Sequence, residues 1–204
     1  MTATAYTLDA GLMPASPSTA PWRVDPARAV LLVHDMQEYF VRTLPPQPAA
    51  DLVRNVTDLV GLCREAGIPV AYTAQPGRMT RADRGLLADL WGRGMTDAEE
   101  DRRIVASLAP KDGDRVYTKW RYSGFFRTDL ERDLRDMGRD QLILCGVYAH
   151  IGVLATAMDA YSRDVETFLV ADALADFDER WHRIALDQAT ECCSVVRPLA
   201  EALA

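Results

Sequence analysis

Two ionisable side chains of this sequence stand where expected strands end, and either could take part in chemistry. Asp35 follows the run 30–34 (VLLVH), and Lys119 follows the run 115–118 (RVYT). A carboxylate in apolar surroundings has a raised pKa, so Asp35 could hold a proton near neutral pH and donate it as a general acid. Lys119 could pair with a substrate carboxylate as a compact positive charge. Taken singly, each is better explained by structure: a helix cap or turn for Asp35, a surface strand end for Lys119.

Other residues could bind a ligand near such an acid. Gln75 opens a turn-rich segment (75–80, QPGRMT), Arg84 follows it, and Trp91 lies in a glycine-containing loop. A structural alternative stays open for each, because turn glutamines bond to backbone, surface arginines are usually solvated and tryptophans usually belong to the core. The segment 146–152 (GVYAHIG) opens an apolar helix, where backbone N–H groups can bind anions.

Cysteine and histidine chemistry is not expected. The chain has four cysteines, and Cys145 stands within an apolar run, as an inert core residue would. The cysteine spacing matches neither a disulfide framework nor a zinc site, which favours the reduced thiols of a cytoplasmic protein. The three histidines are far apart in the sequence, so we expect structural roles for them and neither a metal nor another cofactor.

The alternation of apolar runs and amphipathic segments predicts an α/β fold. We expect three layers: an open, doubly wound, mostly parallel sheet of about six strands, Rossmann-like, with helices on both faces. Runs such as 29–33 are apolar on both faces, as parallel strands covered from both sides are. The expected strands are Ala29–His34, Pro69–Thr73, Arg115–Thr118, Gln141–Val147, Thr167–Ala171 and Ser194–Arg197.

Helical spacing predicts several of the connecting segments. Apolar residues recur at this spacing in 52–63, before Gly67, and in 130–137, before Gly138. Glycine just after the last periodic residue is a typical helix stop.

Three further helices are expected. A capping box of Asp176 and Glu179 would begin one of them, and a short helix would cover Asp97–Leu108. The helix His150–Tyr161 has little polar surface, so we expect it to be buried centrally or covered by a second subunit. The second possibility predicts a homodimer, with the N-terminal arm reaching across it.

The candidate residues fall at equivalent places in the predicted sheet. In an open parallel sheet, ligands bind beyond the carboxyl ends of the strands, near the reversal of strand order. Asp35 ends the first expected strand, Gln75 follows the second, Lys119 ends the third and Tyr148–Gly152 follow the fourth. We therefore expect these residues to share one site.

Composition limits the function classes. The chain has 204 residues and a formal net charge of −7, which argues against nucleic acid and anionic membranes as partners. The N-terminus lacks a signal-peptide pattern and no segment is apolar for long enough to span a bilayer, so we expect a cytoplasmic protein. Residues 1–26 are expected to form an extended arm and 27–204 the domain. If the substrate is an anion, Arg84, Lys119 and Arg121 could concentrate positive charge locally.

Several segments, taken together and in order, resemble the isochorismatase-like hydrolase family. The resemblance runs from about Ala27 to the C-terminus. Its segments are 34–37 (HDMQ), 72–76 (YTAQP), 119–123 (KWRYS), 146–152 (GVYAHIG) and 170–177 (VADALADF).

This resemblance implies roles for individual residues. Asp35 matches the general acid and Lys119 the active-site lysine. Many members add a cysteine nucleophile, but Gly152 stands at its position here, and an acid and a lysine without a thiol suit proton-driven cleavage of an enol ether. The resemblance also implies a cis peptide bond before Tyr148. Substrate-binding positions would be Gln75, Arg84, Tyr148 and the backbone of Gly152, with pocket walls at Trp91, Tyr39 and Tyr122.

Within the family, segments 75–80 and 84–92 (RGLLADLWG) look most like the phenazine-pathway branch. The implied reaction hydrolyses the enolpyruvyl ether of 2-amino-2-deoxyisochorismate, a small anion derived from chorismate, to pyruvate and trans-2,3-dihydro-3-hydroxyanthranilate. One alternative is an isochorismatase that makes 2,3-dihydro-2,3-dihydroxybenzoate for a siderophore. Others are a cysteine hydrolase, against which Gly152 argues, and a catalytically silent docking partner.

Overall fold

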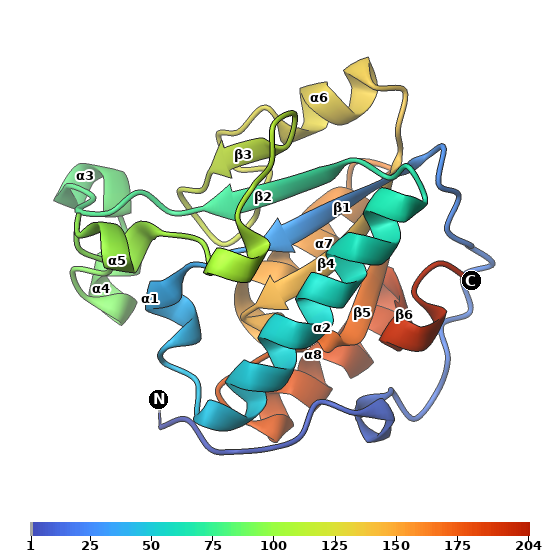
Figure 1. Cartoon of the computed structure of the whole chain (residues 1–204), viewed down its shortest axis with the longest axis horizontal. Coiled ribbons are helices and arrows are strands. Elements are labelled where there is room, and N and C mark those ends of the chain that lie inside the picture. Colours follow the sequence, from blue (N-terminus) through green and yellow to red (C-terminus); the bar gives the residue numbers. More distant parts are fainter. Residues whose placement is uncertain (1) are drawn as a thin grey trace.

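In residues 2–204, which the computed structural model describes, six parallel strands form one sheet (Figure 1). The strand order is β3-β2-β1-β4-β5-β6 and every neighbouring pair is parallel, which confirms the predicted doubly wound α/β fold. The strands are β1 (Ala29–His34), β2 (Val70–Ala74), β3 (Arg115–Thr118), β4 (Gln141–Val147), β5 (Glu166–Ala175) and β6 (Ser194–Arg197).

Helices cover both faces of the sheet (Figure 1). One face packs against α2 (Pro46–Glu65), which contacts β1, β2, β4 and β5, and the other packs against α7 (Leu154–Tyr161) and α8 (Glu179–Cys192). The strand order reverses between β1 and β4, the place where such sheets bind ligands. The shorter helices are η1 (Ala10–Leu12), α1 (Glu38–Val41), α3 (Arg81–Arg84), α4 (Leu87–Trp91), α5 (Glu99–Arg102), η2 (Ala106–Leu108), α6 (Leu130–Asp136), η3 (Ala149–Val153) and η4 (Leu199–Glu201).

Side-chain burial explains the two helices predicted from spacing. The apolar stripe of α2 is fully buried against the sheet, as is Leu130 at the start of α6. Gly138 follows α6 with a φ of 66°, the left-handed conformation that glycine adopts readily after a helix. The fully buried stripe of α2 consists of Leu52, Val56, Leu59 and Cys63.

The predicted capping box of α8 is wrong by two residues. The helix cap is Asp178, whose Oδ1 accepts from the backbone N–H of Trp181 at 2.9 Å. Asp176 is fully buried and bonds elsewhere, accepting from the backbone N–H groups of His150 and Phe177. The reason is tertiary: the Asp176 carboxylate satisfies buried donors of the turn after β4, so it is not free to cap a helix.

The continuous helix expected over Asp97–Leu108 is also wrong. The segment divides into α5 and η2, and between them Ile104 pairs with Gln37 in an antiparallel bridge. The backbone N–H of Val105 donates to Met36 O at 2.9 Å. Backbone pairing with the segment after β1 therefore extends the chain where spacing alone favoured a helix.

Strand β5 runs four residues beyond its predicted end at Ala171. It continues to Ala175, with a register shift against β4 between Leu144 and Gly146. Asp172 lies within this extension, and its Oδ1 accepts from the backbone N–H of Leu199 at 2.7 Å. That bond accommodates a carboxylate in a strand, where the residue type is otherwise unfavourable.

The N-terminal arm packs against its own chain. It is extended apart from η1, and Tyr6, Leu8 and Leu12 are buried. Tyr6 Oη lies 2.9 Å from His182 Nδ1, and the backbone N–H of Thr4 donates to Phe177 O at 2.8 Å. The arm is therefore anchored over α8 and the end of β5.

The apolar helix expected over His150–Tyr161 consists of η3 followed by α7, and its own chain covers most of it. Leu154, Thr156, Ala157 and Ala160 are buried, chiefly under α8 and β5, and Tyr161 is the exposed residue at its end. Burial within the chain therefore accounts for much of the missing polar surface. Among the described residues, no helix combines the length and apolarity needed to cross a membrane.

The homodimer stays a prediction. We expect the partner to cover the incompletely buried side of α7, where Ala155, Met158 and Tyr161 lie, and to bury on the order of 1,600 Å² in total. Light scattering at micromolar concentration should give twice the 22.6 kDa mass of the chain, and Tyr161→Arg should shift this value toward the chain mass. A mass near 22.6 kDa for the unaltered protein would contradict the prediction.

Candidate active site

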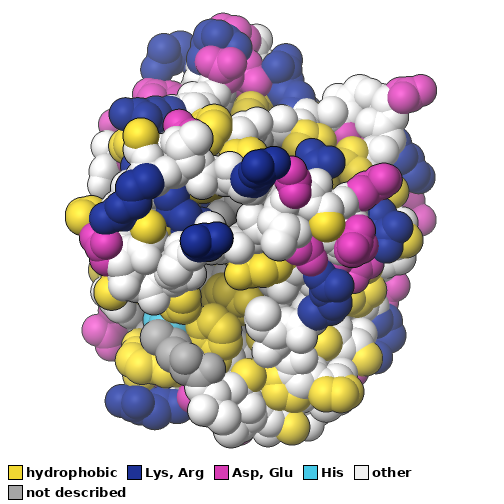
Figure 2. Space-filling model, turned by 90° about the vertical axis from the view of Figure 1, so that its left-hand side faces the viewer, with side chains coloured by type: hydrophobic (Ala, Val, Ile, Leu, Met, Phe, Trp, Pro, Cys, Tyr) yellow, Lys and Arg dark blue, Asp and Glu magenta, His cyan; other side chains and the backbone are white. Residues whose placement is uncertain are grey.

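A pocket of about 260 Å³ lies at the carboxyl ends of β1 to β4. On the side toward which β1 and β2 point in Figure 1, Figure 2 shows a hollow lined by hydrophobic side chains, with Lys and Arg side chains gathered above it. The structure brings the predicted catalytic and substrate-binding residues into this one lining, and Arg121 lies outside it. The lining consists of Ala3, Asp35, Tyr39, Phe40, Thr43, Gln75, Arg84, Leu87, Trp91, Lys119, Tyr122, Val147, Tyr148, Ile151, Gly152 and Phe177.

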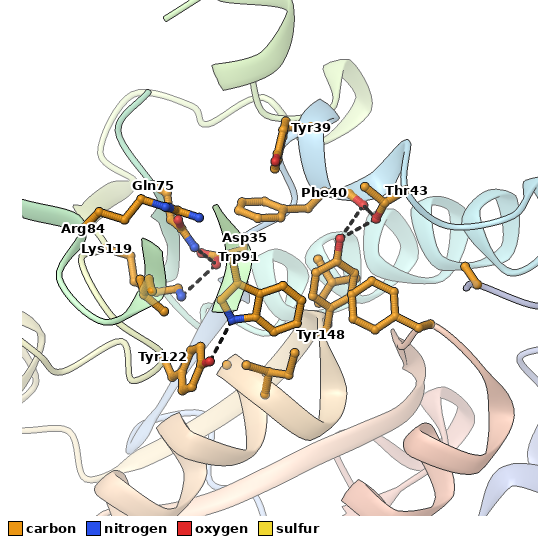
Figure 3. Close-up of a pocket in the computed structure, with 16 residues that line it drawn as sticks. Asp35, Tyr39, Phe40, Thr43, Gln75, Arg84, Trp91, Lys119, Tyr122 and Tyr148 are labelled. Carbon is orange, nitrogen blue, oxygen red and sulfur yellow. Dashed lines mark hydrogen bonds and ion pairs between the residues drawn. The ribbon is translucent and has the colours of Figure 1, made fainter. Parts of the chain in front are cut away.

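An ion pair between Asp35 and Lys119 forms the floor of the pocket (Figure 3). Lys119 Nζ lies 2.8 Å from Asp35 Oδ2, and both residues are buried, with exposed fractions of 2% and 4%. Thr73 Oγ1 donates to Asp35 Oδ1 at 2.6 Å, and Gln75 Nε2 lies 3.4 Å from Oδ2. Lys119 also donates to the backbone carbonyl of Arg121 at 2.8 Å. The carboxylate is thus held by donors from β2 and from the segments that follow β2 and β3.

The pKa of Asp35 differs from the value expected from burial alone. Burial raises this pKa, but the Lys119 charge and the hydrogen bonds from Lys119 and Thr73 outweigh it, so the pKa lies below its usual value. In the ligand-free pocket Asp35 is therefore ionised at neutral pH. In that state its carboxylate can accept a proton but has none to donate.

Asp35 adopts a backbone conformation that aspartate tolerates better than most residues. Its φ is +50°, in the left-handed region, which costs roughly 1–2 kcal/mol for most L-residues. Its backbone N–H donates to Thr73 Oγ1 at 3.1 Å, and the same hydroxyl donates to its carboxylate. Thr73 therefore holds both ends of Asp35.

Gln37 positions Gln75 through the backbone. Its side-chain oxygen accepts from the Gln75 N–H at 2.7 Å, and its Nε2 donates to Gln75 O at 3.0 Å and to Arg102 O at 2.7 Å. With an exposed fraction of 1%, Gln37 makes these bonds away from solvent. The Gln75 side chain is thereby aimed at Asp35, as Figure 3 shows.

Arg84 brings a second positive charge to the pocket. It is 7% exposed and its Nε donates to Gly92 O at 2.6 Å, but among the described residues no carboxylate lies within salt-bridge distance of it. Burial lowers its pKa, although an arginine keeps its proton in any case. A buried guanidinium without a carboxylate partner favours an anionic ligand.

Arg121 does not line the pocket, in contrast to its predicted role. Its Nη1 donates to the carbonyls of Asp83 and Trp120 at 2.6 and 2.7 Å. It therefore links the segment after β3 to α3, the helix that carries Arg84. The reason is geometric: its side chain reaches the neighbouring loop, and that contact uses its donors.

Aromatic side chains form the walls. Trp91 Nε1 donates to Tyr122 Oη at 2.8 Å, and Tyr148 stacks on Phe177 with ring centroids 4.3 Å apart. The Tyr148 hydroxyl donates to Phe40 O at 3.0 Å, and burial raises its pKa. The Val147–Tyr148 peptide is cis, as the resemblance implied. These rings suit a small planar or cyclic ligand with polar groups at one end.

Sequence reasoning missed several contributors. Thr73 and Gln37 lie inside segments that were recognised, but nothing in their types indicated that they hold Asp35 and Gln75. Ala3 and Phe177 line the pocket because the arm bonds to Phe177 O. Such long-range contacts leave no pattern in the sequence.

Comparison with known proteins adds a family to this geometry. Residues 29–201 match the Isochorismatase domain. The chain belongs to the isochorismatase family. It is 54% identical over 201 residues to Phenazine biosynthesis protein PhzD1 of Pseudomonas aeruginosa, covering 98% of this chain and 96% of that protein. It is 54% identical over 177 residues to Phenazine biosynthesis protein PhzD of Pseudomonas fluorescens, covering 87% and 86%.

Solved structures agree on the fold. The structure of a cysteine hydrolase from Pseudomonas syringae pv. phaseolicola matches with a TM-score of 0.81 at 26% identity, covering 93% of this chain and 96% of the other. That protein is named a cysteine hydrolase, whereas this chain presents Gly152 to the pocket.

None of the cysteines of this isochorismatase-family chain lines the pocket. Cys145 is fully buried and burial raises its pKa well above the usual value, whereas Cys192 is exposed. Within the described residues, no group of three or more His, Cys, Asp and Glu side chains could hold a metal ion.

We predict that thiol alkylation leaves activity intact. Iodoacetamide should modify the exposed Cys192 and spare Cys145, because the latter is buried and protonated. Cys145→Ala should lower the melting temperature more than the control Cys192→Ala, with pyruvate release per folded molecule unchanged for both. Stoichiometric labelling of Cys145 that tracks loss of activity in folded protein would contradict this.

Proposed function

We propose that this protein hydrolyses the enolpyruvyl ether of 2-amino-2-deoxyisochorismate to pyruvate and trans-2,3-dihydro-3-hydroxyanthranilate, in a phenazine-type biosynthetic pathway. The observation that carries the proposal is the composition of the pocket floor: a buried carboxylate beside a buried ammonium, with Gly152 in place of a nucleophile. That set can move a proton, and the pocket lining contains no cysteine thiol. The relatives named for phenazine biosynthesis support the pathway.

The cations of the pocket suit a substrate with two carboxylates. Arg84, which has no carboxylate partner among the described residues, would bind one of them as a bidentate pair. Lys119 would exchange part of its contact with Asp35 for the enolpyruvyl carboxylate, and Gln75 would complete the orientation. Fixed contacts of this kind bring the reacting carbon to the acid and lower the entropic part of the barrier.

Asp35 acquires its proton in the complex. In the empty pocket Lys119 holds the Asp35 pKa low, but a bound dianion offsets the lysine charge and excludes water. Both changes disfavour the ionised form of Asp35, so the Asp35 pKa rises and the side chain takes up a proton. Substrate binding thus creates the acid that the reaction requires.

The proton then passes from Asp35 to the methylene carbon of the enolpyruvyl group. The C=C electron pair forms the new C–H bond and leaves an oxocarbenium ion at the ether carbon. Water adds to that carbon and returns a proton to the Asp35 carboxylate. The hemiketal then collapses: the bond between its carbon and the bridging oxygen breaks, the hydroxyl proton passes to that oxygen, and pyruvate and the ring alcohol leave. The proton transfer is the difficult step because carbon is a poor base.

We predict that Asp35→Asn and Asp35→Ala lose at least ~10²–10⁴-fold in kcat, the factor that a positioned acid supplies. Substrate should still bind to Asp35→Asn, because Lys119 and Arg84 remain and the lysine has lost its internal counter-charge. Pyruvate release should be measured with the amino- and the hydroxy-substituted ethers and with nicotinamide.

The matched control is Asp136→Asn, the same change at an exposed position of α6. It should retain the activity of the unaltered protein. Pyruvate release by Asp35→Asn close to that of the control would remove Asp35 from the mechanism, and preferential turnover of the hydroxy ether would reassign the substrate to isochorismate.

A second prediction concerns pH. Asp35 is ionised in the free protein and protonated in the reactive complex, so kcat/KM should fall as pH rises through the neutral range, by up to tenfold per unit. Calorimetry in buffers of different ionisation enthalpy should detect uptake of about one proton when an unreactive dianionic analogue binds. Asp35→Asn should bind the analogue without that uptake, and unchanged proton uptake in this variant would place the proton elsewhere.

A further inference from the structure

His34, the residue before Asp35, is fully buried behind the pocket, and its ring has a single orientation. Its Nδ1 lies 2.8 Å from the carbonyl oxygen of Val147, which can only accept, so Nδ1 carries the proton. Burial lowers the pKa of His34 to about 4, so the ring is neutral at pH 7 and Nε2 is an acceptor. Nε2 faces the Thr156 hydroxyl at 3.3 Å. The Thr156 hydroxyl donates its one proton to Gly152 O, so the hydrogen bond from Nδ1 to Val147 O is the one that orients the ring.

Two glycines pack directly against this residue. A Cβ atom at Gly152 would lie 2.4 Å from His34 Cε1, 3.2 Å from Nε2 and 3.3 Å from Nδ1. A Cβ atom at Gly146, where φ is +107°, would lie 2.2 Å from the His34 carbonyl oxygen. Normal carbon contacts are about 3.5–4.0 Å, so neither position accepts a side chain while His34 keeps its place.

The same residue also holds the chain that forms the pocket wall. Val147 precedes Tyr148, and Gly152 closes the same turn, with its carbonyl accepting from Thr156 Oγ1 at 2.7 Å. His34 thus contacts both ends of the segment 147–152, through a hydrogen bond at one end and ring packing at the other. Asp35 follows His34 immediately, so this contact joins the proposed acid to the opposite wall.

We infer that His34 is a positioning residue whose ring requires glycine at position 152 and sets the distance between Asp35 and the segment 147–152. The steric half of the inference is independent of the reaction, and the effect on turnover rests on the proposed function. The pairing explains why position 152 lines the pocket with backbone alone: the volume that a side chain there would need is filled by the His34 imidazole.

A double-mutant cycle tests the steric half. Gly152→Ala should lower the melting temperature and reduce kcat/KM by about 10²-fold, the order expected for a displacement near 1 Å. In the His34→Ala background the same substitution should have little further effect, because the ring that it meets is gone. Equal losses from Gly152→Ala in both backgrounds would overturn the inference.

A matched control is His182, the other fully buried histidine with a pKa lowered to about 4 by burial. It bonds Ala171 O and Tyr6 and is not part of the pocket lining. His182→Ala should also lower the melting temperature, but its effect should add to that of Gly152→Ala without coupling. If Gly152→Ala coupled as strongly to His182→Ala as to His34→Ala, the coupling would reflect a general loss of packing, and the specific pairing of His34 with Gly152 would be overturned.

The positioning half is tested by rescue. His34→Asn keeps an N–H near the place of Nδ1, so it should restore the bond to Val147 O and recover much of the kcat that His34→Ala loses, with KM changing little in either. Equal kcat for the folded His34→Asn and His34→Ala variants would overturn the positioning role. This comparison does not need the Gly152→Ala variant, so it still tests the inference if that variant fails to fold. Absence of pyruvate release by the unaltered protein would reject the proposed function, while the cycle on melting temperature would still test the pairing.

Discussion

The ion pair between Asp35 and Lys119 is the interaction on which the site depends. Removing one partner of a buried pair typically costs about 3–5 kcal/mol, because the other charge is left without compensation in a medium of low polarity. The fold sustains the pair by bringing hydrogen-bonding groups to both partners. Thr73 and Gln75, from β2 and its continuation, donate to the carboxylate, and the Arg121 carbonyl accepts from the lysine. A parallel sheet provides such convergence naturally, since its strands end at one edge.

The same pair determines the protonation state of the carboxylate. Lys119 holds Asp35 in its ionised form. Arg84 adds a second buried positive charge, and it does so in a chain whose net charge is −7. On the function proposed above, this one electrostatic arrangement would select a dianion and, once the dianion is bound, would favour a proton on Asp35.

Segments distant in sequence complete the pocket. The arm places Ala3 in the lining through its bonds to the end of β5, and Gln37 ties Gln75 to the segment before Ile104. In each of these contacts a backbone N–H or C=O group forms a hydrogen bond with a residue far away in the sequence. Displacement of any of them would move a wall of the pocket without touching the acid itself.

The sequence by itself determined the parallel α/β class, because its apolar runs and helical stripes carry the two periods of these elements. It also indicated the site, because Asp35, Lys119 and their companions follow strands whose carboxyl ends must meet. Only the tertiary structure decided the direction of the Asp35 pKa, the use of Asp176 to satisfy a buried turn and the interruption of the helix expected over Asp97–Leu108. All three depend on which distant group lies a few ångströms away, and spacing along one chain does not encode that distance.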